Sequence, residues 1–190
     1  MKVLVACEFS GVVRTAFERR GHTAWSCDFE ETTVPGNHYR GDVFDIIGEQ
    51  WDLMIAHPPC TFLCSSGLHW NKRRPGREQE TQKALEFVAR LLNAPISKIA
   101  LENPVGRIST AIRKPDQNIQ PWMFGEDASK KTCLWLKNLP LLTPTKIIKK
   151  DRYANQTPSG QNNLGPSKDR WKLRAITYQG IADAMADQWG

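Results

Sequence analysis

The first hundred residues alternate between short apolar runs and segments whose apolar residues recur at helical spacing. We expect strands at 3–7, 23–27, 51–56 and 99–101, with a weaker third strand closing at 41–42. Helical spacing predicts helices over 11–20 and 78–92. Strands that alternate with helices predict right-handed βαβ crossovers. The sequence therefore predicts an α/β fold with a mostly parallel sheet and helices on both faces.

The rest of the chain is less regular. An apolar run predicts a strand at 133–136, and helical spacing predicts a closing helix at 181–189. Residues 154–167 are turn-rich, and 65–77 are polar and predicted to be a loop. Because 190 residues suit one compact domain, we expect a single domain over 1–190, with a basic, loop-rich segment at about 137–175.

Composition argues against a membrane protein and against a disulfide framework. No apolar run approaches the length that spans a bilayer, and Glu8 and Arg14 interrupt the apolar start, so we expect a cytoplasmic protein without membrane contact. The five cysteines form no Cys-x-x-Cys pair, and the histidines are scattered. We therefore expect neither a disulfide framework nor a metal site.

Positive charge is concentrated in one stretch. The net charge is +6, and residues 130–174 hold eleven Lys or Arg against two Asp. Such a local excess is typical of a surface that contacts phosphates. A solvated basic surface explains a charge run of this kind equally well.

Polar residues at the predicted strand ends suggest a nucleoside-binding site. The turn after the first strand consists of Glu8, Phe9, Ser10 and Gly11. Gly11 allows close backbone approach at a helix N-terminus, although a Ser-Gly turn is more often a plain cap. Asp28 ends the second strand, where an acid typically binds ribose hydroxyls, although alone it could be a solvated loop residue. Together with Asp42 after the third strand, it fits an adenosine-containing ligand better. The absence of Gly-x-Gly-x-x-Gly argues against a dinucleotide.

The reactive residues follow two other strands. His57, Pro58, Pro59 and Cys60 follow one apolar strand, and Glu102 and Asn103 follow another. Two prolines fix the direction of the next side chain, which suits a nucleophile, although a lone cysteine is more often buried and inert. A thiolate that adds to C6 of cytosine activates C5 toward a sulfonium methyl group. A carboxyl group at N3 assists that addition as a general acid.

These motifs resemble those of the DNA cytosine-C5 methyltransferases. Phe9-Ser10-Gly11 resembles the first cofactor motif, 52–60 the strand and Pro-Pro-Cys turn, 61–67 the mobile loop, and Glu102-Asn103 the Glu-Asn pair. Over nearly its full length, the chain resembles short phage-encoded members of this group. The stretches that carry this likeness are 100–104, 119–125, 131–136 and 180–189.

The resemblance implies a Rossmann-like class I fold that uses S-adenosylmethionine, with S-adenosylhomocysteine as product and double-stranded DNA as substrate. Cys60 would be the nucleophile, and Glu102 and Asn103 would hold the flipped cytosine. The cofactor would contact Glu8, Phe9, Ser10, Gly11, Asp28, Asp42 and Pro58.

The chain departs from the family's pattern in three ways. His57 replaces a small residue, and no Arg-x-Arg motif is present, for which Lys130, Lys131, Arg170 and Arg174 are candidate substitutes. The large target-recognition domain is also missing. Sequence choice would then be short or relaxed, or would come from a second subunit or a specificity partner.

DNA contact is expected at Ser65 and at the basic residues of two segments. These are Ser65, Lys72, Arg73, Arg74 and Arg77 in the first, and Lys131, Lys146, Lys149, Lys150, Arg152, Lys168, Arg170, Lys172 and Arg174 in the second. Trp70 and Trp171 are candidates to stack on bases when the target is extruded, or equally to pack on the core.

Three other functions compete with this hypothesis. The pocket could take free cytosine nucleotides, although the basic stretch favours a polymer. An N4 or N6 amino-methyltransferase would carry an aromatic residue where Cys60 stands. A non-catalytic DNA-binding or anti-restriction module could keep the fold, although Cys60 and Glu102 argue against it.

Overall fold

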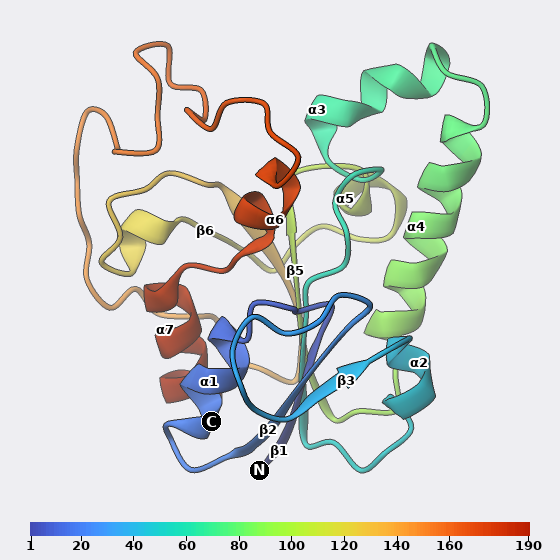
Figure 1. The fold of residues 1–190 in the computed structure, drawn as a ribbon, viewed down its shortest axis with the longest axis vertical. Helices are drawn as coiled ribbons and strands as arrows, with labels where there is room; N and C mark the ends of the chain where they lie inside the picture. The colour runs from blue at the N-terminus through green and yellow to red at the C-terminus, as the bar shows by residue number, and fades with distance from the viewer.

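The computed structural model describes all residues from Met1 to Gly190. Seven strands form one sheet in the order β3-β2-β1-β4-β5-β7-β6 (Figure 1). All neighbouring strands are parallel except β7, which runs antiparallel to both β5 and β6. The strands are β1 (Lys2–Ala6), β2 (Thr23–Asp28), β3 (His38–Arg40), β4 (Leu53–Ala56), β5 (Lys98–Pro104), β6 (Gln117–Ile119) and β7 (Thr132–Lys137).

Helices cover both faces of the sheet, as Figure 1 shows. α1 (Val12–Glu18) and α7 (Gln179–Trp189) pack on one face, and α2 (Val43–Ile46) and α4 (Arg77–Leu92) lie on the other. Strand residues alternate between two buried clusters, with Val3 and Val5 facing α1 and α7 while Leu4 and Ala6 face α4. Burying both faces requires the continuous apolar strands that the sequence contains. The expected Rossmann-like α/β fold is confirmed.

Two segments differ from the sequence-based expectation. Residues 65–77 were predicted to be a loop, but they contain α3 (Ser65–Leu68) and the 3-10 turn η1 (His69–Lys72). Neither turn buries a residue, so no apolar periodicity marks them in the sequence. The helix α6 (Arg170–Ala175) likewise buries none of its residues and was not predicted. The remaining short elements are α5 (Ile108–Ala111) and the 3-10 turn η2 (Pro121–Met123).

Strand β5 is longer than its apolar run predicts. Glu102 and Asn103 were expected to follow the strand, but they lie within it, because β7 continues to pair there with Leu134 and Cys133. Successive side chains in a strand point to opposite faces. Glu102 and Asn103 therefore serve opposite faces of the sheet.

Arg14 is a charged residue within the core. Its side chain is fully buried, and its guanidinium donates to Ser26 Oγ and to the carbonyl oxygens of Val34, Pro35 and Asn37. These bonds fix the loop between β2 and β3 against α1. No helix of the structure combines the length and apolarity that a membrane span requires.

Candidate active site

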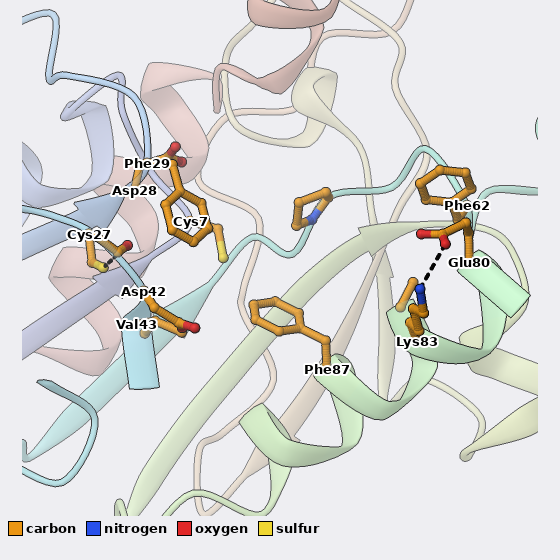
Figure 2. Close-up of a pocket in the computed structure, with 13 residues that line it drawn as sticks. Cys7, Cys27, Asp28, Phe29, Asp42, Val43, Phe62, Glu80, Lys83 and Phe87 are labelled. Carbon is orange, nitrogen blue, oxygen red and sulfur yellow. Dashed lines mark hydrogen bonds and ion pairs between the residues drawn. The ribbon is translucent and has the colours of Figure 1, made fainter. Parts of the chain in front are cut away.

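The strand order reverses at β1, whose neighbours β2 and β4 lie on opposite sides. Ligands of such sheets bind at this switch point, beyond the carboxyl ends of the strands. A cavity of about 340 Å³ lies there, within the usual range for small-molecule sites. Figure 2 shows Asp28, Phe29 and Asp42 on one side of it and Phe62, Glu80 and Lys83 on the other, with Phe87 of α4 between them.

The two aspartates predicted at this site both line the cavity. Asp28 ends β2 and accepts the backbone N–H of Glu30 at 3.0 Å. Burial raises the pKa of Asp28 more than its hydrogen bonds lower it. Asp42 caps α2 by accepting the N–H of Phe44 at 3.0 Å, which leaves its second carboxylate oxygen free of that bond.

Glu8 lies at the end of β1, but its carboxylate is committed to the protein. It is 4% exposed and accepts the backbone N–H groups of Val13 at 2.7 Å and Arg14 at 3.2 Å. Burial raises the pKa of Glu8 despite the charge of His57 and these hydrogen bonds. The free N–H groups that the sequence suggested for a ligand at the start of α1 are therefore used by Glu8.

Glycine is required at position 11 because a side chain there would collide with its neighbours, not because the position leaves room for a ligand. Its φ is 68°, and a Cβ atom there would lie 2.5 Å from Val34 Cγ2. Phe9 is buried, with its ring 6.1 Å from that of Trp171. The predicted cofactor residues thus divide into two sets, because Asp28 and Asp42 line the cavity whereas Glu8, Phe9, Ser10, Gly11 and Pro58 do not.

Cys7, Phe29 and Phe87 are among the residues lining this cavity that the sequence analysis missed. Cys7 takes a left-handed backbone with φ 59°, which turns the chain between β1 and α1. Burial, followed by the charge of Asp28, raises the pKa of its thiol. Only Phe29 carried a sequence signal, since it follows Asp28 directly.

A second group of polar residues lies where β4 and β5 run side by side. Ala56 pairs with Leu101, so the residues that follow each of them are neighbours. His57 Nδ1 lies 3.0 Å from Glu102 Oε2, and Asn103 Nδ2 donates to the Pro58 carbonyl at 2.7 Å. Asn103 therefore fixes the Pro-Pro turn that presents Cys60.

The surroundings of Glu102 favour its ionised form. Burial raises its pKa, but the hydrogen bond from His57, the charge of Lys130 and a hydrogen bond from Thr132 outweigh that effect, and the pKa of Glu102 is lowered. The side chains of His57 and Glu102 are 7% and 16% exposed. This pairing joins residues 45 positions apart.

The thiol of Cys60 lies beside that of Cys64, four residues further along the chain. The N–H of Cys64 donates to the Cys60 carbonyl at 3.0 Å, and the two thiols lie close enough for a hydrogen bond between them to shift both of their pKa values. That bond, then burial and the charge of Glu102, raises the pKa of Cys60. The same bond lowers the pKa of Cys64, whose Sγ also lies 3.1 Å from Ser66 Oγ. The negative charge of the thiol pair therefore lies on Cys64, which only the four-residue spacing could have indicated.

The C-terminal segment around α6 interacts both with residues near the cavity and with residues near Cys60 and Glu102. Lys172 Nζ lies 2.5 Å from Glu30 Oε2, and Lys130 Nζ donates to the Arg174 carbonyl at 2.9 Å. The charge of Arg174 acts on Cys64, and that of Lys130 acts on Glu102. Of the four candidates to replace the missing Arg-x-Arg motif, Lys130 and Arg174 thus act directly on the reactive side chains.

The predicted DNA-contacting residues lie on two segments at the carboxyl edge of the sheet, around α3 and α4 and in the loops that lead to α6 (Figure 1). Several already have partners: Arg73 and Arg74 lie over the Trp70 ring, Arg77 donates to the Thr61 carbonyl, and Lys150 pairs with Asp127. Lys72, Lys131 and Lys149 are exposed, and Trp171 is 53% exposed. Ser65 begins α3 beside Cys64.

The structure contains no group of three or more His, Cys, Asp or Glu side chains that could hold a metal ion.

No protein-family model and no curated protein matches this chain. Among solved structures, the chain resembles an rRNA methylase from Escherichia coli with 15% identity and a TM-score of 0.41, over 71% of this chain and 55% of the other. It also resembles a mutant of DNMT2 from Spodoptera frugiperda with 18% identity and a TM-score of 0.41, over 78% and 54%. The chain spans about half the length of each.

Proposed function

We propose that this protein is an S-adenosylmethionine-dependent DNA cytosine-C5 methyltransferase with Cys60 as its nucleophile. One observation carries the proposal. Neighbouring parallel strands place the Cys60 turn and Glu102 together at the carboxyl edge, beside a cavity lined by Asp28 and Asp42. Pro59 lines that cavity and directly precedes Cys60, so the thiol and the cavity adjoin through one residue.

The cavity residues fit the nucleoside part of the cofactor. Asp28 supplies a carboxylate that can accept ribose hydroxyls, and Phe29, Val43 and Phe87 supply apolar surface for a base. S-adenosylmethionine bound there would supply a sulfonium methyl group. Because burial raises its pKa, Asp28 ionises less readily than an exposed aspartate, which suits hydrogen bonding to uncharged hydroxyls.

Covalent catalysis requires Cys60 to act as a thiolate on C6 of cytosine. Contact with Cys64 raises the pKa of Cys60, so the proton of Cys60 has to leave as the bond to C6 forms. Glu102 lies close enough to Cys60 to act on the same base, although its charge raises the pKa of the thiol. Asn103 holds the turn through Pro58 and so fixes the direction of attack.

A DNA substrate is supported by charge. The excess of positive charge in residues 130–174 exceeds what a mononucleotide needs, and exposed lysines on both segments lie at the same edge as Cys60. Contact with phosphates would offset the cost of extruding the target base. A second subunit or separate partner would supply sequence choice.

The test offers tritiated cofactor to the protein with duplex DNA, RNA of the same sequence and dCTP in parallel. We expect label in duplex DNA as 5-methylcytosine, identified by mass spectrometry of nucleosides, and none with Cys60→Ser. Label in dCTP or RNA would replace DNA as the substrate class. No label with any acceptor, combined with DNA binding, would favour the non-catalytic module.

A further inference from the structure

The turn from Cys60 to Cys64 brings two cysteine side chains together, of which the proposed chemistry uses one as a nucleophile. The N–H groups of Leu63 and Cys64 both donate to the Cys60 carbonyl at 3.0 Å, which closes one helical turn. The first and fifth α-carbons of such a turn lie roughly 6 Å apart. Disulfides bridge α-carbons about 4.4–6.8 Å apart, so the backbone places this pair within reach of a disulfide.

Both ends of this turn are held by β5 and the residues that follow it. Asn103 donates to the Pro58 carbonyl at 2.7 Å, which fixes the chain before the turn. The Arg107 N–H donates to the Leu63 carbonyl at 2.7 Å, which fixes the end of the turn. Gly106 allows this approach, because a Cβ atom there would collide with the Leu63 carbonyl oxygen. The backbone therefore keeps the two cysteines close together.

Cys64 has the surroundings of a reactive thiol. Its side chain is partly exposed, and its sulfur lies 3.1 Å from Ser66 Oγ. Contact with Cys60 lowers the pKa of Cys64, and hydrogen bonds from Ser66 and Gly67 add to that effect, although burial opposes it. Peroxides oxidise cysteines that are ionised, accessible and next to a second thiol.

The other three cysteines lack this combination. Cys27 and Cys133 are buried, and burial raises the pKa values of both thiols. Cys7 is partly exposed at the cavity, but burial, followed by the charge of Asp28, raises its pKa as well. Of the five cysteines, Cys64 alone has a lowered pKa and a second thiol beside it.

We propose that Cys60 and Cys64 form an oxidation site for hydrogen peroxide, at which a reversible disulfide blocks the nucleophile. The disulfide follows from the arrangement of the two thiols. Its effect on methyl transfer rests on the proposed function.

The oxidation has two steps. The Cys64 thiolate attacks one oxygen of the peroxide, so that an S–O bond forms, the O–O bond breaks and hydroxide leaves. Cys64 is then a sulfenic acid, and its two electrons have reduced the peroxide. The Cys60 sulfur attacks the Cys64 sulfur, so that an S–S bond forms, the S–O bond breaks and hydroxide leaves with the Cys60 proton as water.

The first step prepares the second. Contact with Cys64 is the largest cause of the raised pKa of Cys60, and an uncharged sulfenic acid no longer exerts the effect of a thiolate. Cys60 therefore loses its proton more readily once Cys64 is oxidised. A dithiol restores both thiols by exchange and becomes a disulfide itself.

The experiment treats the reduced protein with hydrogen peroxide, removes the peroxide with catalase and alkylates the remaining thiols after denaturation. Trypsin releases both cysteines on one peptide, residues 41–72, because this stretch contains no Lys or Arg before Lys72. A disulfide within this peptide removes two hydrogen atoms and both alkylation sites, which mass spectrometry detects. Methyl transfer to plasmid DNA is measured before peroxide, after peroxide and after dithiothreitol.

In the wild-type protein, peptide 41–72 should lose both alkylation sites, and methyl transfer should fall by about tenfold or more. Dithiothreitol should restore both. Cys133→Ser, at a buried thiol that donates to Asn118 Oδ1, is the matched control and should behave in the same way. Cys64→Ser should form no disulfide, and peroxide should inactivate it about tenfold more slowly than wild type, each measured against its own untreated rate.

Three results separate this inference from the proposed function. Cysteines 60 and 64 that both stay alkylatable, or a cysteine of peptide 41–72 that gains oxygen without forming the disulfide, would overturn the inference alone. Inactivation of Cys64→Ser at the wild-type rate would place the sensitive thiol elsewhere and do the same. A disulfide that forms in a protein whose reduced form transfers no methyl would support the oxidation site and overturn the proposed function.

Discussion

The two halves of the carboxyl edge of the sheet differ in what shifts the pKa values of their ionisable groups. In the half formed by β1, β2 and β3, burial dominates and raises the pKa values of Glu8, Asp28 and Cys7. In the half formed by β4, β5 and β7, partners lower the pKa values of Glu102 and Cys64, whereas contact with Cys64, together with burial, raises that of Cys60. The first half suits an uncharged nucleoside, and the second suits a thiolate and a carboxylate.

The difference follows from how each half is assembled. The first half comes largely from one continuous segment, residues 7–43, whose strand ends carry acids but few cations near them. The second half joins the Cys60 turn to Glu102, Lys130 and Arg174, which lie far apart in the sequence. Cations from late in the chain thus stabilise anions from its middle. If this division is correct, substitutions in one half should change binding and those in the other should change rate.

Of the substitutions considered, Glu102→Gln should lower the rate of methyl transfer most. It keeps the size of the side chain but removes the charge that pairs with His57 and Lys130. We expect methyl transfer at saturating cofactor to fall by about 10²–10³-fold, since a positioned general acid contributes on this scale. Cofactor affinity, measured by calorimetry, should be unchanged. A variant that weakens cofactor binding instead would show that the two halves are not separate.

Asp28→Asn should have the opposite signature. It removes one of the carboxylate charges that line the cavity but keeps an oxygen that can accept the Glu30 N–H. Loss of hydrogen bonds to a charged group costs about 1.5–3 kcal/mol, so cofactor affinity should weaken by about 10–100-fold. The rate at saturating cofactor should stay near wild type. Glu31→Gln, at an exposed neighbour paired with Arg40, is the control and should leave affinity unchanged.

The pair formed by Cys60 and Cys64 should show a smaller effect, a pH-dependent difference in how fast its two thiols are alkylated. A lowered pKa means that the Cys64 thiolate persists as pH falls below the usual thiol range, so iodoacetamide should modify Cys64 before Cys60 at pH 6.5. Cys60→Ala removes the thiol that donates to Cys64, and should slow that modification several-fold at pH 6.5 but little at pH 9.5. Peptide mass spectrometry measures both rates. Preferential modification of Cys60 would reverse the assignment of charge in the pair.

The sequence predicted the sheet because its strands are buried on both faces and so appear as uninterrupted apolar runs. It also indicated Asp28 and Asp42, which line the cavity, because Asp28 ends β2 and Asp42 follows β3. It did not predict that Glu8 caps α1, because a carboxylate at a strand end suits a ligand and a helix N-terminus equally.

Other features depend on contacts that no local pattern shows. The burial of Arg14 depends on four acceptors more than ten residues away, one in β2 and three in the loop that follows it. The His57–Glu102 pair depends on the register of β4 and β5. The helices α3 and α6 bury none of their residues, so no buried apolar stripe marks them in the sequence.

The central claim is that the sulfur of Cys60 bonds to a cytosine held at this edge. Duplex DNA containing 5-fluorocytosine tests it directly, because fluorine at C5 blocks elimination after the methyl group has been transferred. With cofactor present, the wild-type protein should form a complex that survives denaturation, with the base attached to the peptide containing Cys60, and Cys60→Ser should form none. A wild-type protein that forms no such complex on DNA it methylates, or a complex attached through Cys64, would contradict the account.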